Sequence, residues 1–428
     1  MNQAPLFWEP HLVVDLFAGG AGASTGIARA IGRPVDIAVN HDPEAMMVHR
    51  ANHPETWHLG GDVFEVNPRV ATRGQRVWIL WASPSCTTHS RARTKAGPLD
   101  QQSRTGGDVV VRWAREVRPR FIFLENVNEW TKWGPCHPDD HPDSMLRGRP
   151  IAGREGEDFD RMIRSIEAAG YSVDMRRLKA HHFGVPTSRE RLFIVCRADR
   201  KPVVWPEPTH GPGLLPFETV RKHLDWENVP PSIFAAGRSL VEATHRRIAR
   251  GLVKFGYTHL ITKGYGEHKT QPPLAMDVDA PLTTIVASGV KHQIVTAFIA
   301  KHFGGKGSPG SSIDAPLGAI TTKDHNALVV GRRETSAERR AATRAWLDHY
   351  VGNGAFPEIE DIGMRALTPR ELFNCQGFPH DYIIDPKVRG KGLSPTSQVR
   401  LVGNSVPPTM ARVVVKANIA TEMGEVVA

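Results

Sequence analysis

A single cysteine occupies a position where a nucleophile is expected. Cys86 follows the strand-forming run 77–81 and Pro84, and a polar, basic stretch continues from it to Gly107. A cysteine thiolate is a strong nucleophile, although a cysteine at a strand end is more often a buried packing residue. The pattern predicts a buried strand, a candidate nucleophile and then a polar loop over residues 87–107.

Acidic and basic side chains beside two other apolar runs suit the same chemistry. Glu125 directly follows four apolar residues, where an acid is costly unless it has a partner or a function. Asn126 comes next, and Arg189 and Arg191 precede another apolar run, alternating onto one face of the predicted strand. A nucleophile, an acid and two cations are residue types that covalent catalysis uses.

A glycine-rich turn near the N-terminus predicts a cofactor site. The apolar run 12–17 contains Asp15 and leads through the turn 18–26 into a helical run. In α/β sheets such a turn is a common ligand site, because glycine lets the backbone approach a ligand and the helix N-terminus offers free N–H groups. Asp15 would repel a pyrophosphate but would attract a cofactor that carries a positively charged amino acid moiety.

A second strand and helix follow at once. Residues 35–39 predict a strand, and Asp42 predicts the N-cap of a helix over 43–51. The end of the second strand often carries an acid for ribose hydroxyls in nucleoside-binding α/β folds, and Asn40 holds that place here. Asp62, at the end of the next short element, is either a group for an adenine amine or an ordinary turn residue.

The composition is that of a soluble globular protein with a polyanionic partner. The chain has 428 residues and a formal net charge of +9, with 40% hydrophobic and 23% charged residues. Nucleic acid is the first candidate partner, and a generally basic proteome is the alternative explanation. The four cysteines lie far apart and neither a signal peptide nor a membrane span is evident, so a cytoplasmic protein is expected.

Changes in amino-acid composition along the chain predict that it has three parts. A catalytic and cofactor-binding domain is expected over residues 1–204, because repeated prolines follow it. Residues 205–365 predict an irregular, mostly β domain with a weak internal repeat, and residues 366–428 would return to the first domain. The insert 130–157 contains Cys, His and Asp residues in a spacing that matches no standard zinc pattern, so no metal site is predicted.

Six short strings, which occur in one order along the chain, carry a resemblance to a known family. The strings are Asp15-Leu-Phe-Ala-Gly, Pro84-Ser-Cys86, Glu125-Asn-Val127, Arg189-Glu-Arg191, Arg370-Glu371 with Gln376-Gly-Phe-Pro379, and Gly403-Asn-Ser-Val-Pro-Pro408. Together they resemble the DNA cytosine-5 methyltransferase family of bacteria and phages. The resemblance covers about residues 11–200 and 365–425, whereas the region between them matches only in place, as the family's variable target-recognition region.

The resemblance implies a fold and a reaction. The fold is an α/β, Rossmann-like methyltransferase sheet with helices on both faces, plus a smaller β-rich target-recognition domain. In the reaction, a cysteine thiolate adds to C6 of a cytosine flipped out of double-stranded DNA, and C5 then takes a methyl group from S-adenosyl-L-methionine. The implied catalytic residues are Cys86, Glu125, Asn126, Arg189 and Arg191. The cofactor-binding residues predicted from the strand ends and the resemblance are Asp15, Phe17, Ala18, Gly19, Gly20, Gly22, Asn40, His41, Asp62, Pro84, Asn404 and Ser405.

The chain departs from the family pattern at three positions. Ser85 replaces a second proline before the cysteine, Thr187 stands where glutamine is common, and Asn40 replaces the usual glutamate. None of these removes a catalytic atom, but Asn40 puts ribose binding, and with it the identity of the methyl donor, in question.

Three other functions compete with DNA methylation. An RNA cytosine-5 methyltransferase would share the fold, and a DNA-binding protein with a decayed methyltransferase fold would lack the intact catalytic set. A nicotinamide dehydrogenase is disfavoured, because Asp15 precedes the turn and no Gly-x-Gly-x-x-Gly pattern is present. A monomer is expected, with a cognate restriction endonuclease as a candidate partner.

Overall fold

The computed structural model describes most of the chain, in two compact units. The described residues are 11–84, 101–228, 230–235, 237, 239–255, 290–295, 298–301, 325–332, 336–356, 359 and 361–420. The first unit comprises Met1–Lys179, Glu190–Glu207 and Ser405–Ala428, and the second comprises Ala180–Arg189 and Pro208–Asn404. The assignment of residues 205–365 to target recognition stays a prediction.

A seven-stranded sheet forms the centre of the first unit, in the order β3-β2-β1-β4-β5-β7-β6. All neighbouring strands from β3 to β5 are parallel, and β7 is antiparallel to both β5 and β6. The strands are β1 (Leu12–Leu16), β2 (Ile37–Asn40), β3 (Trp57–Gly60), β4 (Val77–Ala82), β5 (Phe121–Asn126), β6 (Ser172–Lys179) and β7 (Glu190–Arg197).

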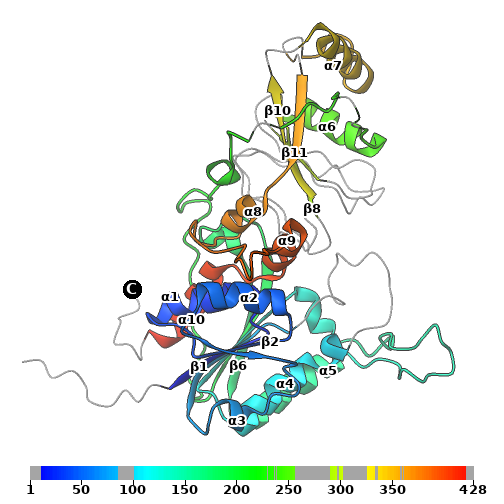
Figure 1. Ribbon diagram of the computed structural model, residues 1–428. Helices are drawn as coiled ribbons and strands as arrows, with labels where there is room; N and C mark the ends of the chain where they lie inside the picture. The colour runs from blue at the N-terminus through cyan, green and yellow to red at the C-terminus, as the bar shows by residue number, and fades with distance from the viewer. Residues whose placement is uncertain are drawn as a thin grey trace, which may run out of the picture. The chain divides into compact units, whose positions relative to one another are not determined.

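Helices cover both faces of this sheet, which confirms the predicted α/β architecture. Figure 1 shows α1, α2 and α10 on one face and α3, α4 and α5 on the other. Because both faces are covered, every residue of β4 is buried and the strand reads as a continuous apolar run. The helices are α1 (Gly22–Ile31), α2 (Pro43–Asn52), α3 (Pro68–Ala71), α4 (Gln101–Glu116), α5 (Glu157–Ala168) and α10 (Pro408–Ile419), with the short 3-10 helix η1 (Asn128–Lys132).

The last helix, α10, completes the first unit by packing on α1. A Cβ added at Gly26 would lie 2.7 Å from the Cβ of Ala411 and would also overlap the carbonyl oxygen of Pro408. A side chain at position 26 is therefore incompatible with the close approach of the two helices. This contact brings the two ends of the chain into one domain.

Two sequence predictions in this unit were wrong. Residues 101–107, expected in a polar loop, lie in α4, where Gly107 is required because a Cβ there would lie 2.5 Å from the Trp133 ring and 2.7 Å from the Met162 sulfur. Because glycine is common in loops, the sequence around Gly107 indicated a loop and not the start of a helix. The strand expected at 178–183 is β6 instead, an edge strand whose half-exposed, polar sequence has no apolar run.

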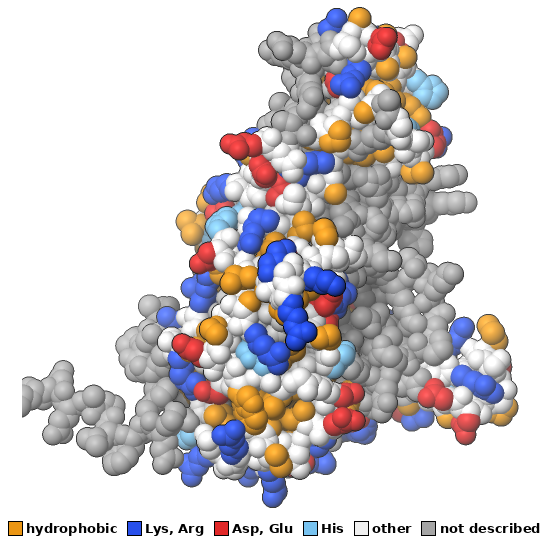
Figure 2. All heavy atoms as spheres, in the orientation of Figure 1, with side chains coloured by type: hydrophobic (Ala, Val, Ile, Leu, Met, Phe, Trp, Pro, Cys, Tyr) orange, Lys and Arg blue, Asp and Glu red, His pale blue; other side chains and the backbone are white. Residues whose placement is uncertain are grey.

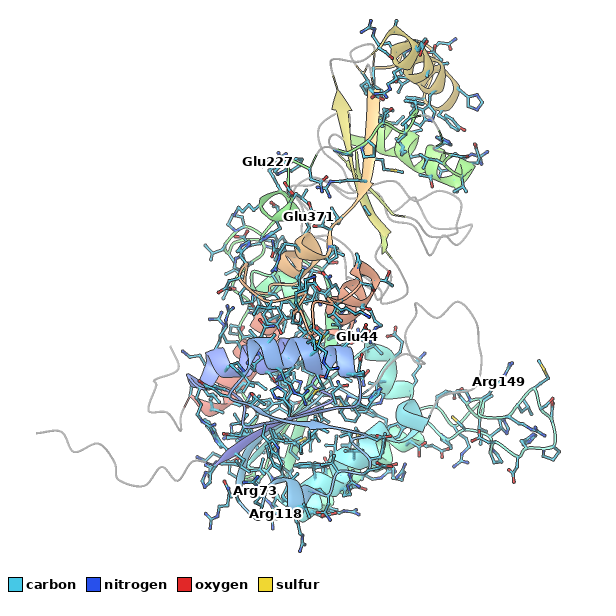
Figure 3. All side chains as sticks on the ribbon, viewed as in Figure 1. Glu44, Arg73, Arg118, Arg149, Glu227 and Glu371 are labelled. Carbon is cyan, nitrogen blue, oxygen red and sulfur yellow. The ribbon has the colours of Figure 1, made fainter. Side chains whose placement is uncertain are left out.

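An insert between η1 and α5 extends away from the sheet. Its two arms are joined by a β-bridge between Cys136 and Pro150, and Arg149 marks it in Figure 3. Among the residues that the structure describes, no group of three or more His, Cys, Asp and Glu side chains could hold a metal ion.

The second unit contains a small closed barrel of strands in the order β10-β11-β8-β9. This agrees with the β-rich character expected of the middle region, although the repeated segments 279–285 and 314–320 lie outside the described residues. The strands are β8 (Val290–Val295), β9 (Phe298–Lys301), β10 (His325–Arg332) and β11 (Asp361–Ala366). The helices are η2 (Ala180–Phe183), η3 (Val220–His223), α6 (Glu242–Phe255), α7 (Ala337–Tyr350), α8 (Pro369–Cys375) and α9 (Pro395–Asn404).

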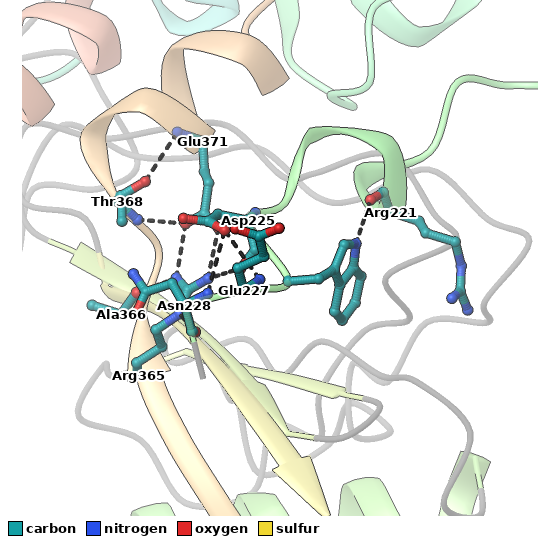
Figure 4. A network of polar contacts seen from close by, with 9 residues as sticks. Arg221, Asp225, Glu227, Asn228, Arg365, Ala366, Thr368 and Glu371 are labelled. Carbon is teal, nitrogen blue, oxygen red and sulfur yellow. Dashed lines mark hydrogen bonds and ion pairs between the residues drawn. The ribbon is translucent and has the colours of Figure 1, made fainter. Parts of the chain in front are cut away.

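A buried ion pair joins β11 to α8 in this unit (Figure 4). Arg365 donates to both carboxylate oxygens of Glu371, at 2.8 and 2.9 Å, and the side chains are only 9% and 2% exposed. Glu371 also accepts from the N–H groups of Asp225 and Thr368, the second of which completes the predicted capping box of α8. Each carboxylate oxygen of Glu371 therefore accepts one hydrogen bond from Arg365 and one from a backbone N–H group. A buried ion pair is tolerated when its polar atoms are satisfied in this way.

Candidate active site

The carboxyl ends of five parallel strands bring most of the predicted site residues to one edge of the sheet. In an open parallel sheet this edge is where ligands bind. Backbone and side-chain hydrogen bonds tie each strand end to the next. These bonds run from Gly61 N to Asn40 O (3.3 Å), Ala18 N to Val39 O (3.1 Å), Ser83 N to Leu16 O (3.4 Å) and Asn126 Nδ2 to Pro84 O (3.2 Å).

The glycine-rich turn holds an unusual backbone. Phe17, Gly19 and Ala21 have φ angles of 59°, 50° and 62°. These values lie in the left-handed region, which residues other than glycine rarely adopt. Strain of this kind is concentrated at ligand sites. Ala21 forms the N-cap of α1 without a side-chain hydrogen bond, so the side chain of the N-cap residue does not compete with a ligand for the first N–H groups of the helix.

Asp15 lies beneath this turn as a buried carboxyl group. It is 1% exposed, and its Oδ2 accepts a 2.6 Å hydrogen bond from the Ser24 hydroxyl, whereas Oδ1 is buried with no hydrogen-bond partner. Burial raises the pKa of Asp15 to about 7, against the lowering effect of its hydrogen bonds with Ser24. A cationic group of a ligand would give Oδ1 the partner that it lacks.

The contacts of Ser24 continue into a group of histidines that the sequence reading did not single out. Ser24 Oγ lies 2.9 Å from His49 Nε2, and His49 Nδ1 lies 2.9 Å from His58 Nε2. A second pair runs alongside, with Thr25 Oγ1 3.0 Å from His53 Nε2. The available signal was the i, i+4 spacing of His49 and His53, which places His53 at the C-cap of α2, one turn after His49.

The ends of β2 and β3 carry the residues expected to contact a nucleoside. Asn40 is 9% exposed, and its Oδ1 accepts from the N–H of Asp42, which fixes the turn into α2. Asp62 is half-buried, and its Oδ1 accepts from the N–H of Phe64. His41 is exposed.

Arg112 of α4 is a positioning residue that sequence reasoning missed. Its guanidinium donates to the carbonyl oxygens of Val63, Phe64 and Val66, at 2.7 to 3.0 Å. The segment that directly follows Asp62 is therefore held by a helix on the opposite side of the sheet from α1.

Glu125, at the end of β5, is paired with Arg191 of the antiparallel neighbour β7. The Arg191 Nε atom lies 3.2 Å from Glu125 Oε1, and the side chains are 12% and 7% exposed. Arg191 also donates from Nη1 to the Glu190 carbonyl oxygen, which limits the orientation of its guanidinium. The pair places a carboxylate and a cation together in an environment where water is largely excluded, and there their interaction is strong.

Asn126 connects this pair to the segment that precedes the candidate nucleophile. It is 2% exposed, donates from Nδ2 to the Pro84 carbonyl oxygen and accepts at Oδ1 from the N–H of Val127. Cys86 itself lies outside the described residues, two positions after Pro84 in the sequence.

The remaining predicted residues fall in the two units as follows. In the second unit, Arg189 is 4% exposed and donates from Nη1 to the carbonyl oxygen of Gly403, 3.0 Å away, beside the exposed Asn404. The hydroxyl of Thr187 accepts from the Arg189 N–H, so the threonine that replaces glutamine supports the local backbone. In the first unit, Ser405 is buried just ahead of α10.

Comparison with known proteins identifies the family. A family model described as C-5 cytosine-specific DNA methylase matches residues 12–135 and 149–420. The chain belongs to the C-5 cytosine-specific DNA methylase family. It is accordingly a DNA cytosine methyltransferase, as the six strings predicted. The segment between the matched parts, 136–148, is the tip of the extended insert.

Several relatives are type II methyltransferases. The chain is 27% identical over 240 residues to M.AquIA of Picosynechococcus, which covers 51% of this chain and 89% of the relative. It is 24% identical over 416 residues to M1.HphI of Haemophilus parahaemolyticus, which covers 96% of this chain and 87% of the relative.

Solved structures show the same fold. The Dnmt2 methyltransferase of Schizosaccharomyces pombe superposes with a TM-score of 0.53 at 14% identity, covering 96% of this methyltransferase and 99% of that chain. A mutant DNMT2 of Spodoptera frugiperda gives a TM-score of 0.52 at 16% identity, with the same coverage. Within the described residues, no helix is both long and apolar enough to cross a membrane.

Proposed function

We propose that this methyltransferase transfers a methyl group from S-adenosyl-L-methionine to C5 of a cytosine in double-stranded DNA, through a covalent adduct between Cys86 and C6 of the base. One observation carries the proposal. The buried Glu125–Arg191 pair lies at the end of β5, and the adjacent Asn126 is hydrogen-bonded to Pro84, two positions before Cys86. These contacts support the proposal, because an acid and a cation lie beside the strand end that precedes Cys86 in the sequence.

The chemistry explains why these residue types are needed. C5 of cytosine is a poor nucleophile, and addition of the Cys86 thiolate at C6 converts the ring into an enamine whose C5 can attack an electrophilic methyl group. The donor supplies that methyl group on a sulfonium centre. Loss of the C5 proton and departure of the thiolate then restore the ring, leaving 5-methylcytosine and the free cysteine.

Glu125 and the arginines would control charge on the ring during addition. Glu125 would hold N3 and the exocyclic amine of the base, so that negative charge arising on thiolate attack is neutralised at N3. Its partner Arg191, and Arg189, would face O2 of the base and the carboxylate of Glu125. Asn126 would fix the backbone at Pro84 and so the start of the nucleophile's segment.

The glycine-rich turn fits the methionine part of the donor. The unpartnered Oδ1 of buried Asp15 suits the donor's ammonium group, and the uncapped N-terminus of α1 suits its carboxylate. Phe17 would stack on the adenine, Asp62 would accept from its amino group, and Asn40 would hydrogen-bond the ribose. Asn404 and Ser405 would close over the amino acid moiety.

DNA recognition would be divided between the two units. A cytosine within a duplex cannot reach the site, so it has to be flipped out, and the flanking bases have to be read by another part of the chain. Residues 205–365 would supply this reading. The net charge of +9, with Lys and Arg side chains spread over the face drawn in Figure 2, suits a polyanionic substrate. A cognate restriction endonuclease would be a partner, and the enzyme would act as a monomer.

The test compares three proteins on the same substrates. Wild-type enzyme, Cys86→Ala and Glu125→Gln are incubated with labelled S-adenosylmethionine and either duplex DNA or RNA, and the DNA product is sequenced after bisulfite treatment. We expect C5 methylation of DNA by the wild type, none by Cys86→Ala, and a rate lowered by a factor of about 10² to 10⁴ for Glu125→Gln. Cofactor binding should be nearly unchanged in Cys86→Ala. Retained methylation by Cys86→Ala would remove this cysteine from the mechanism, and transfer to RNA alone would overturn the DNA assignment.

A further inference from the structure

A continuous chain of polar contacts runs from Asp15 to His58 across four elements of the first unit. Asp15 of β1 bonds to Ser24 of α1 at 2.6 Å, Ser24 contacts His49 of α2 at 2.9 Å, and His49 contacts His58 of β3 at 2.9 Å. The proposed methyl transfer uses none of the last three side chains. Such a network is costly to bury, so its presence calls for an explanation.

The chain leads from the interior toward the surface. Asp15, Ser24 and His49 are at most 1% exposed, whereas His58 is half-buried on β3, the edge strand of the sheet. One end therefore lies under the glycine-rich turn, and the other end lies within reach of solvent.

The Ser24 hydroxyl and the two imidazoles can each donate a hydrogen bond to either of their neighbours in this network. With Asp15 ionised, Ser24 donates to the carboxylate, the Nε2–H of His49 donates to Ser24, and the Nε2–H of His58 donates to His49 Nδ1. A proton added at Nδ1 of His58 allows each group to pass one proton inward. Asp15 is then protonated, both imidazoles are neutral again, and each carries its remaining proton on Nδ1 instead of Nε2.

We propose that Asp15, Ser24, His49 and His58 form a proton wire that couples ligand binding at the glycine-rich turn to proton release at the sheet edge. The inference rests on the proposed function, because the ligand is the donor with its ammonium group. When that cation binds beside Oδ1, the ionised form of Asp15 is favoured, and the proton that Asp15 held leaves through Ser24 and the two histidines. Ser24, His49 and His58 are positioning residues in this scheme and do not touch the reacting atoms.

The histidines near Asp15 do not fix its protonation state, so this state can change when a ligand binds. Burial lowers the pKa of all three histidines, helped by the neighbouring rings at His49 and at His53, whose pKa falls to about 4, and by Arg50 at His58, so none supplies a fixed positive charge at neutral pH. Arg50 of α2, which contributes to this lowering, is exposed.

Within the described part of the chain, burial and the hydrogen bonds with Ser24 set the pKa of Asp15, and no charged side chain of another element is among the causes. In the sheet, the residues opposite Asp15 on β2 and β4 are Ala38 and Trp81. Arg412 and Lys416 of α10, which packs on α1, are exposed. The pKa of about 7 for Asp15 places its titration in the range where the wire would operate.

Calorimetry of S-adenosylmethionine binding tests the thermodynamic part. Titrations from about pH 5.5 to about pH 8.5, each in two buffers of different ionisation enthalpy, give both the Kd and the number of protons released. We expect close to one proton released per ligand below the pKa of Asp15, falling toward zero above it. The Kd should weaken up to about tenfold per pH unit below an inflection near pH 7. In Ser24→Ala the inflection should move to higher pH, because a hydrogen bond to the ionised form is lost.

Ring-nitrogen NMR of histidine-labelled enzyme tests the wire itself. The tautomers of His49 and His58 should switch together from Nδ1–H to Nε2–H as the free protein passes through the same inflection, or when ligand is added at low pH. Ser24→Ala should abolish this switch. Thr25→Ala is the matched control, because it removes the neighbouring hydroxyl–imidazole contact to His53 without touching Asp15, and it should leave the switch and the inflection in place.

The outcomes separate this inference from the function on which it rests. Failure of S-adenosylmethionine to bind at every pH would overturn the donor assignment and the wire together. Binding with a pH-independent Kd, no proton release and fixed tautomers would overturn the wire and leave the methyltransferase mechanism standing. Proton release with fixed tautomers would also contradict it, since the proton would then leave Asp15 by another route.

Discussion

At the scale of single residues, the carboxyl groups of this enzyme differ in how they are held. Glu125 has a cationic partner in Arg191, whereas Asp15 is hydrogen-bonded to the neutral Ser24, and in each acid one buried oxygen has no hydrogen-bond partner. The type and position of both acids were predicted from the sequence, because an acid within an apolar strand stands out. Their partners come from other strands and helices and were not. The catalytic role assigned to Glu125 and the cofactor-binding role assigned to Asp15 stay predictions.

The raised pKa of Asp15 gives a pH-dependent cost to folding. An unfolded aspartate ionises near pH 3.8, so between that value and the folded pKa of about 7 the native state is progressively destabilised as pH rises. Asp15→Asn removes the titration. We expect the free energy of unfolding of the variant, relative to the wild type, to increase by roughly 2 kcal/mol between about pH 5.5 and about pH 8.5 in denaturant titrations without ligand. Parallel stability curves for the two proteins would contradict the buried, uncompensated state of this carboxyl group.

At the scale of elements, apolar strands were predictable and polar or glycine-containing ones were not. β1, β4 and β5 are buried on both faces and read directly as apolar runs, and the N-cap Asp42 and the capping box of α8 gave two helix starts. The half-exposed β6 carries no such run. Gly107 within α4 allows close packing against Trp133 and Met162, a tertiary contact that no local pattern reveals.

The contact between α1 and α10 makes a sharp prediction for one glycine. In Gly26→Ala the new Cβ would overlap backbone and Cβ atoms of α10, so the helices have to separate, and we expect a loss of about 1–3 kcal/mol in unfolding free energy. Gly60→Ala is the matched control, because nothing lies within 4 Å of a Cβ there. It should change the unfolding free energy by no more than about 0.5 kcal/mol. Equal effects of the two substitutions would show that the α1–α10 packing is not tight.

At the scale of the whole molecule, catalysis and sequence recognition are expected to be separable. The first unit contains the strand ends with most of the predicted site, and the second contains the small barrel within the part of the chain that carries few family strings. The β-rich character of the middle region was predicted from short β segments with Gly and Pro turns, but a closed barrel was not. The strand pairing of the barrel was not predicted either, because it depends on contacts between distant segments.

An exchange of residues 205–365 with the corresponding region of a relative of known site tests this separation. The catalytic unit would contact one flipped cytosine, so the flanking base pairs have to be read elsewhere, through hydrogen bonds to base edges. We expect the chimaera to methylate the donor's sequence, as read by bisulfite sequencing. An active chimaera that still methylates the parental sequence would place recognition outside this region. A swap of residues within 87–100 alone is the control and should leave the site unchanged.

The covalent step is the central claim, and a mechanism-based trap measures it most directly. Duplex DNA with 5-fluorocytosine at the target position is incubated with enzyme and S-adenosylmethionine, then analysed on a denaturing gel and by peptide mass spectrometry. Fluorine at C5 cannot leave as a proton, so the adduct cannot eliminate. We expect a stable protein–DNA band with the methylated base attached to the peptide that contains Cys86, and no band with Cys86→Ala. An enzyme that methylates ordinary cytosine but forms no such adduct, or attaches the base to another residue, would contradict the mechanism.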